Sequence, residues 1–580
     1  MSAAFRLLSL LLSALLAVGA AQAQTADVDD DDDEEPAPAA AAGPRPPPPN
    51  LPALDLTVPL LYEMLFGEIA LQRGSAGLAA QTYAELARRT KDPRIARRAV
   101  EIANFARTPQ YALEAARAWH EADPASLQAL QTLAGLLVGA RKVDEAEPYL
   151  ARLLASDGAA AANGFLQLGR LLASNPDKQA NQRVVRRLAA KYPDLPQARL
   201  ALAQAAFAAD DEAGALAEAR RAAQLQPGWE APAIFEAQVL QRRSPAEAGK
   251  ALAGFLDQFP KAREARLSYA RLLVAERKLP EARAQFEKLL DAHPNDGDVI
   301  YAVGLLAAQL KDYATAETNL KRLLDLGFRD PNGVRFTLGQ VAEEQKNWQA
   351  ATDWYLSIQS GEHYLPSRLR TAGVMSKEGR LAEAREFLRT VSASGEQRIQ
   401  LLIVEAQLLR EANQHREAFE LLGKALEAQP EQPELLYDHA LTAEKLERFE
   451  ALEGSLRKLI QLKPDHAHAH NALGYSFAER NLRLPEARKL IERALELSPE
   501  DYYIVDSLGW VLYRMGDLPG AAAQLRRAYL GRPDGEIGAH LGEVLWVMGE
   551  RVEAERIWQD ALKNHPENET LHKTVKRLRR

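Results

Sequence analysis

The stretch 471–533, NALGYSFAERNLRLPEARKLIERALELSPEDYYIVDSLGWVLYRMGDLPGAAAQLRRAYLGRP, decides the fold because it nearly repeats itself about every 34 residues. Leu508-Gly509 is followed by one alanine twelve residues after the glycine, a second nineteen after it, and a proline twenty-four after it. The next unit keeps the same offsets from Leu541-Gly542. A fixed period of this length predicts an array of small repeats rather than a domain with one central core.

Each unit has the pattern of two antiparallel helices. Leu508, Gly509 and Leu512 follow helical spacing, and a glycine inside a helix costs roughly 1 kcal/mol relative to alanine. We expect close approach of the second helix, at the level of Ala521, to require this small residue. Since proline cannot sit inside a helix, the prolines that close the units predict the turns between them: Pro464, Pro499, Pro533 and Pro566.

This pattern resembles that of the tetratricopeptide repeat (TPR) family. The resemblance covers about residues 60–568 and implies an all-α fold, a right-handed superhelix or α-solenoid of about 15 helix-pair repeats. The small residue of the family pattern recurs with a mean spacing near 34 at Gly67, Ala103, Ala134, Gly169, Ala203, Ala237, Ala270, Gly304, Gly339, Ala372, Ala406, Ala440, Gly474, Gly509 and Gly542.

The match to the family pattern varies along the chain. Residues 53–200 hold degenerate TPR-like repeats, whereas 201–568 follow the pattern closely. The unit at Ala237 lacks the alanine of its second helix, because Gly249 stands at that offset. The unit at Gly474 carries one extra residue before Ala487.

The ends of the chain differ from the repeats. Residues 1–23 predict a secretory signal peptide, with an apolar run at 7–18 and cleavage before Gln24, although retention as an anchor is an alternative. Residues 24–52 predict a disordered acidic and Pro/Ala-rich arm, either a solvated spacer or a tail that docks on a basic surface. The apolar segment Leu51–Tyr62 predicts a cap for the N-terminal edge or a docking segment for a partner, and we favour the cap. Residues 569–580 predict a basic C-terminal capping helix.

Composition narrows the compartment and the class of protein. The net charge is −8, of which residues 1–59 carry −7, so the repeats are nearly neutral and a nucleic-acid-binding role is disfavoured. The chain has no cysteine, which excludes disulfides and the acylated cysteine of a bacterial lipoprotein. We therefore expect an exported protein of the periplasm with no membrane segment after signal cleavage.

The sequence offers no catalytic constellation, and we expect neither an enzyme nor a cofactor or small-molecule substrate. The sharpest metal candidates are His466 and His470, which lie four residues apart on one helix face. Histidines near a helix start more commonly pack or face solvent, so no metal site is predicted.

The family resemblance implies binding of a protein on the concave surface formed by the first helices. Its groove positions lie six and three residues before the small residue, and one, four and five after it. Trp510 fits the groove or the packing between units, whereas we expect Tyr475 and Tyr513 to face the groove. Carried onto this chain, the densest patch of aromatic and polar residues is Tyr437, Asn471, Tyr475, Tyr503, Asp506, Trp510, Tyr513, Arg514 and Trp546.

The predicted function is a non-enzymatic periplasmic scaffold or adaptor. The run 471–529 is similar to the C-terminal repeats of proteobacterial envelope TPR proteins, which include a lipoprotein adaptor of a periplasmic carboxyl-terminal processing protease acting on cell-wall hydrolases. That resemblance implies such a protease as partner, although this chain lacks the lipoprotein cysteine. The alternative is a scaffold subunit of a polysaccharide or lipid export machine.

Overall fold

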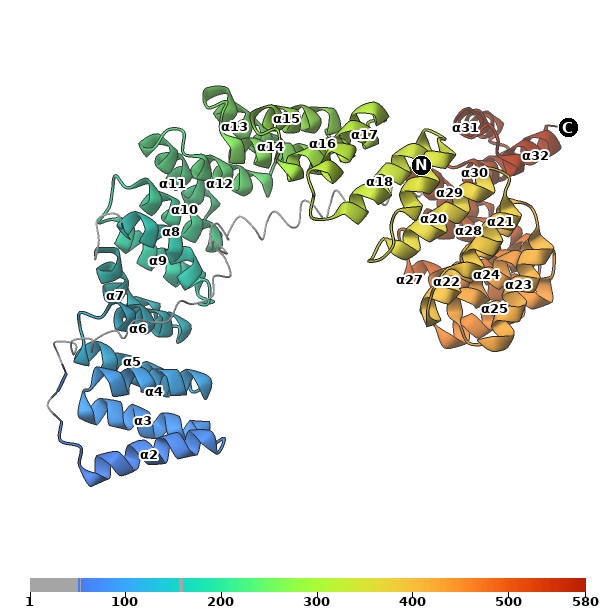
Figure 1. Ribbon diagram of the computed structural model, residues 1–580. Coiled ribbons are helices and arrows are strands. Elements are labelled where there is room, and N and C mark those ends of the chain that lie inside the picture. Colours follow the sequence, from blue (N-terminus) through green and yellow to red (C-terminus); the bar gives the residue numbers. More distant parts are fainter. Residues whose placement is uncertain (1–50, 53, 156–159, 580) are drawn as a thin grey trace. The chain divides into compact units, whose positions relative to one another are not determined.

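The computed structural model describes residues 51–579 except 53 and 156–159 (Figure 1). The predicted signal peptide and nearly all of the acidic arm lie outside these residues. The described chain is all α, with helices α2 to α32 and no strand between 51 and 579 apart from the gaps named. It divides into two units, residues 1–328 and 329–580, which are described separately.

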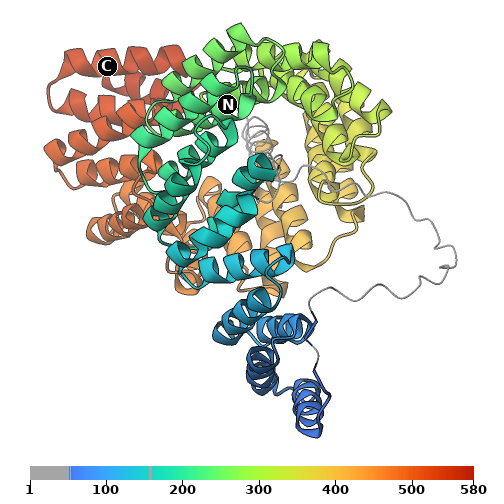
Figure 2. The same ribbon diagram turned by 90° about the vertical axis from the view of Figure 1, so that its left-hand side faces the viewer.

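The first unit holds helices α2 to α17, and in both views its blue helices follow one another in chain order (Figures 1 and 2). Their bounds are α2 Val58–Gln72, α3 Ala76–Thr90, α4 Pro93–Phe105, α5 Pro109–Ala122, α6 Leu127–Gly139, α7 Val143–Ala155, α8 Ala160–Leu172, α9 Lys178–Ala189, α10 Pro196–Ala208, α11 Glu212–Leu225, α12 Glu230–Gln241, α13 Pro245–Gln258, α14 Arg263–Ala275, α15 Leu279–Ala292, α16 Gly297–Gln309 and α17 Tyr313–Asp325.

The second unit holds helices α18 to α32. Their bounds are α18 Pro331–Glu344, α19 Trp348–Leu356, α20 Tyr364–Lys377, α21 Leu381–Thr390, α22 Gly395–Glu411, α23 His415–Ala428, α24 Pro433–Lys445, α25 Phe449–Leu462, α26 Ala467–Glu479, α27 Leu484–Leu497, α28 Tyr502–Arg514, α29 Leu518–Gly531, α30 Gly535–Val547, α31 Arg551–Asn564 and α32 Glu569–Leu578. Within the described residues no helix is long and apolar enough to cross a membrane.

The predicted repeat pattern is confirmed helix by helix. All fifteen small residues fall on the even-numbered helices α2 to α30, each followed by an odd-numbered helix, and Pro464, Pro499, Pro533 and Pro566 lie between helices. Fourteen of the fifteen are buried. The exception is Gly169 on α8, which is exposed because α8 packs on α10 instead of α9, while α9 packs on α7 and α10.

The glycines of the pattern are needed for a reason slightly different from the one predicted. A Cβ added to Gly509 would lie 2.5 Å from Leu525, sixteen residues on, and 3.2 Å from the carbonyl oxygen of Ala521. The same relation holds at the last repeat, where a Cβ on Gly542 would overlap the indole nitrogen of Trp558. The close neighbour is therefore a large side chain one turn beyond the small residue of the second helix.

The lengths of the first helices and of the turns explain both predicted irregularities. Helix α12 ends four residues after Ala237, one residue sooner than α28 ends after Gly509, so the buried alanine of the second helix falls at Ala248 and the expectation that this unit lacks it was wrong. The unit at Gly474 has its extra residue in the turn, where Asn481 and Arg483 both adopt positive φ. Ala487 is thereby returned to a fully buried position.

The C-terminal helix α32 covers the end of the second unit. Leu571 is fully buried and Val575 nearly so, and both belong to the core that runs through α24 to α31. Lys573, Lys576 and Arg577 lie on the exposed side. The segment that we expected to cap the N-terminal edge behaves differently, because Leu54, Leu56 and the outer face of α2 are exposed.

Candidate protein-binding surface

The nine residues predicted to bind a partner lie on the first helices α24, α26, α28 and α30 of the second unit. The structure brings three of them, Tyr475, Asp506 and Trp510, into contact with one residue that the sequence did not single out, His540 on α30, and Tyr513 packs on Trp510. This residue and its neighbours are the central cluster of the surface.

His540 and Asp506 form a buried ion pair between successive repeats. The imidazole Nδ1 lies 3.0 Å from a carboxylate oxygen of Asp506, and the two residues are only 4% and 5% exposed. Burial alone would lower the pKa of His540, but the charge and hydrogen bond of Asp506 outweigh this and raise it. Asp506 is therefore occupied inside the molecule and does not face a partner.

Trp510 also packs between repeats. Its ring stacks on His540 with centroids 4.2 Å apart and planes at 21°, and the side chain is 5% exposed. Its indole N–H donates to Glu479 at 2.7 Å, which satisfies the one donor of the ring. Of the two alternatives for this tryptophan, the structure selects packing.

Tyr475 and Tyr513 are half-buried at the rim of the cluster, each with its hydroxyl on a carboxylate. Tyr475 on α26 donates to Glu536 on α30 at 3.5 Å, and Tyr513 on α28 donates to Glu543 at 3.2 Å. The contact between α26 and α30 passes over α28, which is the first helix of the repeat between them. Repeats that are not neighbours approach each other only on the inside of a curve, so these first helices line a concave face.

This face is acidic. Glu444 is half-buried, and burial followed by the nearby charges of Glu536 and Glu479 raises the pKa of its carboxyl group, with Lys445 and Arg480 acting in the opposite direction. Burial and the same carboxylates raise the pKa of Tyr475. A segment with basic side chains would relieve this accumulation of negative charge.

The remaining predicted residues lie around the central cluster. Tyr437 packs on His466 with centroids 5.3 Å apart, and Arg514 donates to the backbone carbonyl of Glu479 at 3.2 Å. The ring of Tyr503, 44% exposed, lies under the guanidinium of Arg532 at 4.7 Å.

Two more predicted residues lie apart from these. Trp546 packs on Trp558, with Arg551 over its ring at 5.0 Å. Asn471 keeps a buried side-chain oxygen that has no hydrogen-bond partner among the described residues.

The two histidines considered for a metal have structural roles. His466 is the N-cap of α26 and its Nδ1 accepts from the backbone N–H of Ala469 at 3.1 Å. The Nε2 of His470 donates to the carbonyl of Pro464 at 3.0 Å, and the imidazole is buried. Each ring thus closes the turn that precedes its helix.

The sequence missed a groove in the first unit. It has a volume of about 1880 Å³ and runs along α8, α10, α12 and α14. Of its four helices only α8 lies wholly in the degenerate repeats, and Gly169 and Arg170 of α8 line it together with residues of the regular repeats. Polar and aromatic residues line it, including Arg170, Gln204, Trp229, Glu230, Gln238 and Arg271.

Comparison with known proteins agrees with this architecture. Tetratricopeptide-repeat family profiles match residues 239–308, 301–362, 437–502, 478–537 and 507–569. TPR repeat-containing protein PA4667 of Pseudomonas aeruginosa is 35% identical over 489 residues, which cover 83% of this chain and 82% of the relative. Cellulose synthase operon protein C of Pseudomonas fluorescens is 25% identical over 335 residues, 47% of this chain but only 26% of that protein.

Two solved structures match parts of the chain at low similarity. The thermophilic TPR protein TTC0263 of Thermus thermophilus is 23% identical over 31% of this chain and 97% of its own, with a TM-score of 0.29. The Naa15/Naa10 structure bound to HypK-THB covers 68% of this chain and 67% of its own at 15% identity and a TM-score of 0.36. The repeat pattern, the paired helices and the relative that is similar over most of its length together establish that this chain belongs to the tetratricopeptide repeat protein family.

Proposed function

We propose that this protein is a non-enzymatic scaffold that binds a segment of a protein partner along the first helices of its C-terminal repeats. The observation that carries the proposal is the contact of Tyr475 with Glu536 across α28, which makes α26, α28 and α30 the wall of a concave face. Half-buried tyrosines on such a face offer rigid contact area with polar ends, as binding hot spots require.

The charge of the face indicates the kind of segment that it would bind. Carboxylates of Glu444, Glu479 and Glu536 surround Tyr475, and the pKa of Glu444 is raised by burial and by this crowding. A lysine or arginine placed among them would gain charge-assisted hydrogen bonds and pack its stem on the tyrosine rings. The preferred segment is therefore one with basic side chains.

The location and the partner belong to the same proposal. The apolar run at 7–18 and the small residues that end at Ala23 support export to the periplasm. The similarity of 471–529 to envelope TPR proteins favours an adaptor of a carboxyl-terminal processing protease that acts on cell-wall hydrolases.

A second candidate function is a scaffold subunit of a polysaccharide or lipid export machine. The specific observation in its favour is the similarity of 335 residues to part of cellulose synthase operon protein C. The two candidates use the same face and differ in the partner that they hold.

The test is affinity capture from an envelope extract with residues 24–580 as bait, followed by mass spectrometry. Recovery of a processing protease supports the adaptor, and recovery of a synthase or outer-membrane pore supports the export scaffold. The bait Tyr475→Ala with Tyr513→Ala should lose the partner at least about tenfold, as expected for loss of two aromatic contacts. A matched bait, Tyr111→Ala, changes a half-buried tyrosine on α5 and should bind normally. Equal capture by all three baits would contradict the proposed surface.

A further inference from the structure

The first described helix, α2, has a continuous apolar stripe on its outer face. The spacing of the stripe is that of one side of an α-helix over three turns. Monomeric proteins rarely expose apolar patches of more than a few hundred Å² unless the patch binds something. The stripe consists of Val58, Leu61, Tyr62, Leu65, Phe66 and Ile69, between 40% and 83% exposed.

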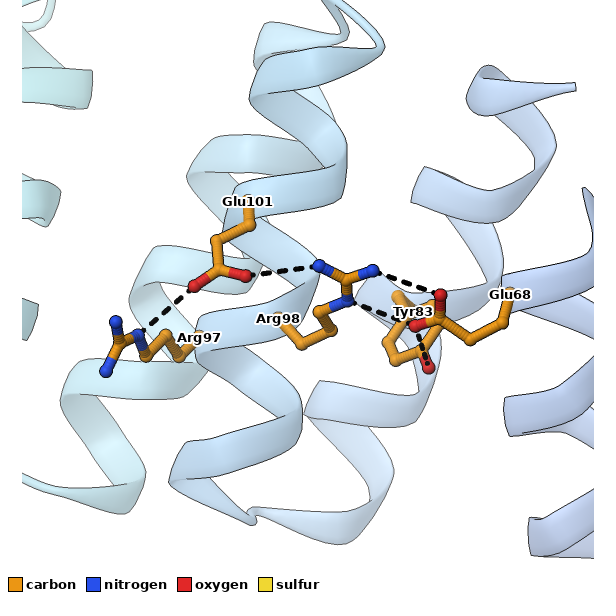
Figure 3. A network of polar contacts seen from close by, with 5 residues as sticks. All are labelled: Glu68, Tyr83, Arg97, Arg98 and Glu101. Atoms are coloured by element: carbon orange, nitrogen blue, oxygen red, sulfur yellow. Dashed lines mark hydrogen bonds and ion pairs between the residues drawn. The ribbon is translucent and has the colours of Figure 1, made fainter. Parts of the chain in front are cut away.

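The inner face of α2 is firmly held, so the exposure of the stripe does not result from a detached helix. Glu68 accepts hydrogen bonds from Arg98 on α4 at 3.0 Å and from the hydroxyl of Tyr83 on α3 at 2.8 Å (Figure 3). Arg98 also pairs with Glu101, which in turn pairs with Arg97 (Figure 3). The ring of Tyr83 packs directly against Gly67.

Internal repeats show what this face of a first helix is for. The positions five before, two before and two after the small residue are occupied in α30 by Ile537, His540 and Val544, all 4% exposed or less. His540 contacts Asp506 and Trp510 of the preceding repeat. In α30 this face is therefore the junction with the repeat before it.

In α2 the same three positions hold large apolar residues that are open to solvent. Tyr62 is 68% exposed, Leu65 53% and Ile69 48%. The face has the chemistry of a repeat junction, and no described residue covers it as a preceding repeat would. It also continues into the exposed Leu54 and Leu56.

We propose that the stripe on α2 binds an amphipathic α-helix of a protein partner, which takes the place of a preceding repeat. The inference rests on the proposed function as a protein-binding scaffold and adds a second surface to it. The molecule contains an example of such a closure in α32, where Leu571 and Val575 seat on the core of the last repeats and basic residues face outwards. The partner helix would span about three turns and carry apolar residues three and four apart.

Other occupants fit the face less well. In the chain that begins at Gln24 after the expected cleavage, Val28 is the one non-proline apolar residue larger than alanine up to residue 50, so this arm lacks a matching stripe. A repeat junction joins two different faces, because His540 contacts Asp506 and Trp510, which occupy other positions in their repeat than His540 does in its own. The α2 face of a second copy is therefore not the matching surface. In a second copy, the end of the last repeat that could complement α2 is covered by α32.

The test places a photo-crosslinking amino acid on the stripe of the full chain in its native host. Leu65→p-benzoylphenylalanine should crosslink on illumination to another protein, and mass spectrometry should locate the crosslink in a peptide with apolar residues at helical spacing. Adding Tyr62→Glu should reduce the yield about tenfold, because a carboxylate would be buried in the junction. The control Gln81→p-benzoylphenylalanine is on the exposed side of the neighbouring helix α3 and should not capture that peptide.

Several outcomes would overturn the inference. A crosslink to α2 of a second copy would mean self-association, and a crosslink to another part of this chain would mean an internal cover. A crosslink to lipid, or no capture above the Gln81 control, would equally contradict a partner helix. The variant Tyr475→Ala with Tyr513→Ala separates the two surfaces, since it tests the proposed function and leaves α2 unchanged. With this variant, loss of the groove partner together with a retained α2 crosslink supports both proposals. A retained groove partner contradicts the proposed function alone, and a missing α2 crosslink contradicts the partner helix alone.

Discussion

The first and last repeats use the same internal packing and end in opposite ways. In both, a glycine of the first helix lies under a large aromatic residue of the second, Gly67 under Tyr83 and Gly542 under Trp558. The last repeat is followed by α32, whose apolar residues are buried, whereas the first repeat begins with α2, whose outer stripe is bare. The repeat unit alone therefore does not determine whether an edge is closed, because closure needs a separate helix of the right pattern.

The difference between the two ends is tested most strongly by a leucine-to-alanine substitution made in α32 and, separately, in α2. Leu571→Ala in α32 should destabilise the last repeats by about 2–5 kcal/mol, because a fully buried leucine leaves a cavity. Leu65→Ala in α2 should change the stability of the first repeats by less than about 0.5 kcal/mol, because that side chain is half exposed. Hydrogen exchange resolved by peptide measures both repeats separately. Equal costs at the two ends would refute the difference between them.

The shared glycine packing makes a second prediction. Gly542→Ala should cost about 1–3 kcal/mol, because its Cβ would overlap the indole of Trp558, which is fully buried and has no room to move. The matched control, Gly454→Ala in α25, meets no atom within 4 Å and should stabilise its helix by up to about 1 kcal/mol. Thermal melting of the two variants should shift in opposite directions, and a shift in the same direction would argue against the close approach.

The buried pair of His540 and Asp506 predicts a pH dependence in the last repeats. Because the pKa of His540 is raised in the folded protein, its contribution to stability is full below about pH 6.5 and is lost as the pH rises through the folded value. The loss amounts to about 1.4 kcal/mol for each unit by which the pKa is raised. Hydrogen exchange of α30 should therefore accelerate towards alkaline pH beyond the intrinsic rate, and His540→Gln should remove this extra slope.

The smallest expected effect concerns the network that holds α2. Glu68→Gln weakens the contact with Arg98, a partly exposed ion pair, and should cost up to about 1 kcal/mol. Exchange at α2 should increase, while exchange at α30 stays unchanged. If α2 were unaffected, the packing of Gly67 against Tyr83 would suffice to hold the helix without the network.

The periodic sequence predicted the fold well because each repeat makes the same local contacts. The positions of all fifteen first helices followed from one small residue, and even the extra residue before Ala487 was visible as a shift in offset. The sequence could not show that α8 and α9 fail to pair. Gly169 on α8 stands at the expected position of the pattern, and what differs is the helix that α8 packs against, α10 in place of α9.

The site was harder to predict than the fold. We expected Tyr475 and Tyr513 to face the groove, and the structure places them half-buried at the rim of the central cluster. The same spacing pointed to Asp506 and Trp510, which His540 holds in the interior. Which of two adjacent faces of a helix is buried depends on the next repeat, and position within one repeat does not carry that information. The segment Leu51–Tyr62 was misjudged for the same reason, since we favoured a cap over a docking segment and the structure leaves most of its apolar side chains exposed.

The central claim, that the first helices of the C-terminal repeats bind a partner, is tested most directly by hydrogen exchange of residues 24–580 with and without the captured partner. We expect slower exchange in α26, α28 and α30, at residues 467–479, 502–514 and 535–547, with little change in α27 and α29. Protection confined to the second helices, or to the first unit, would contradict it.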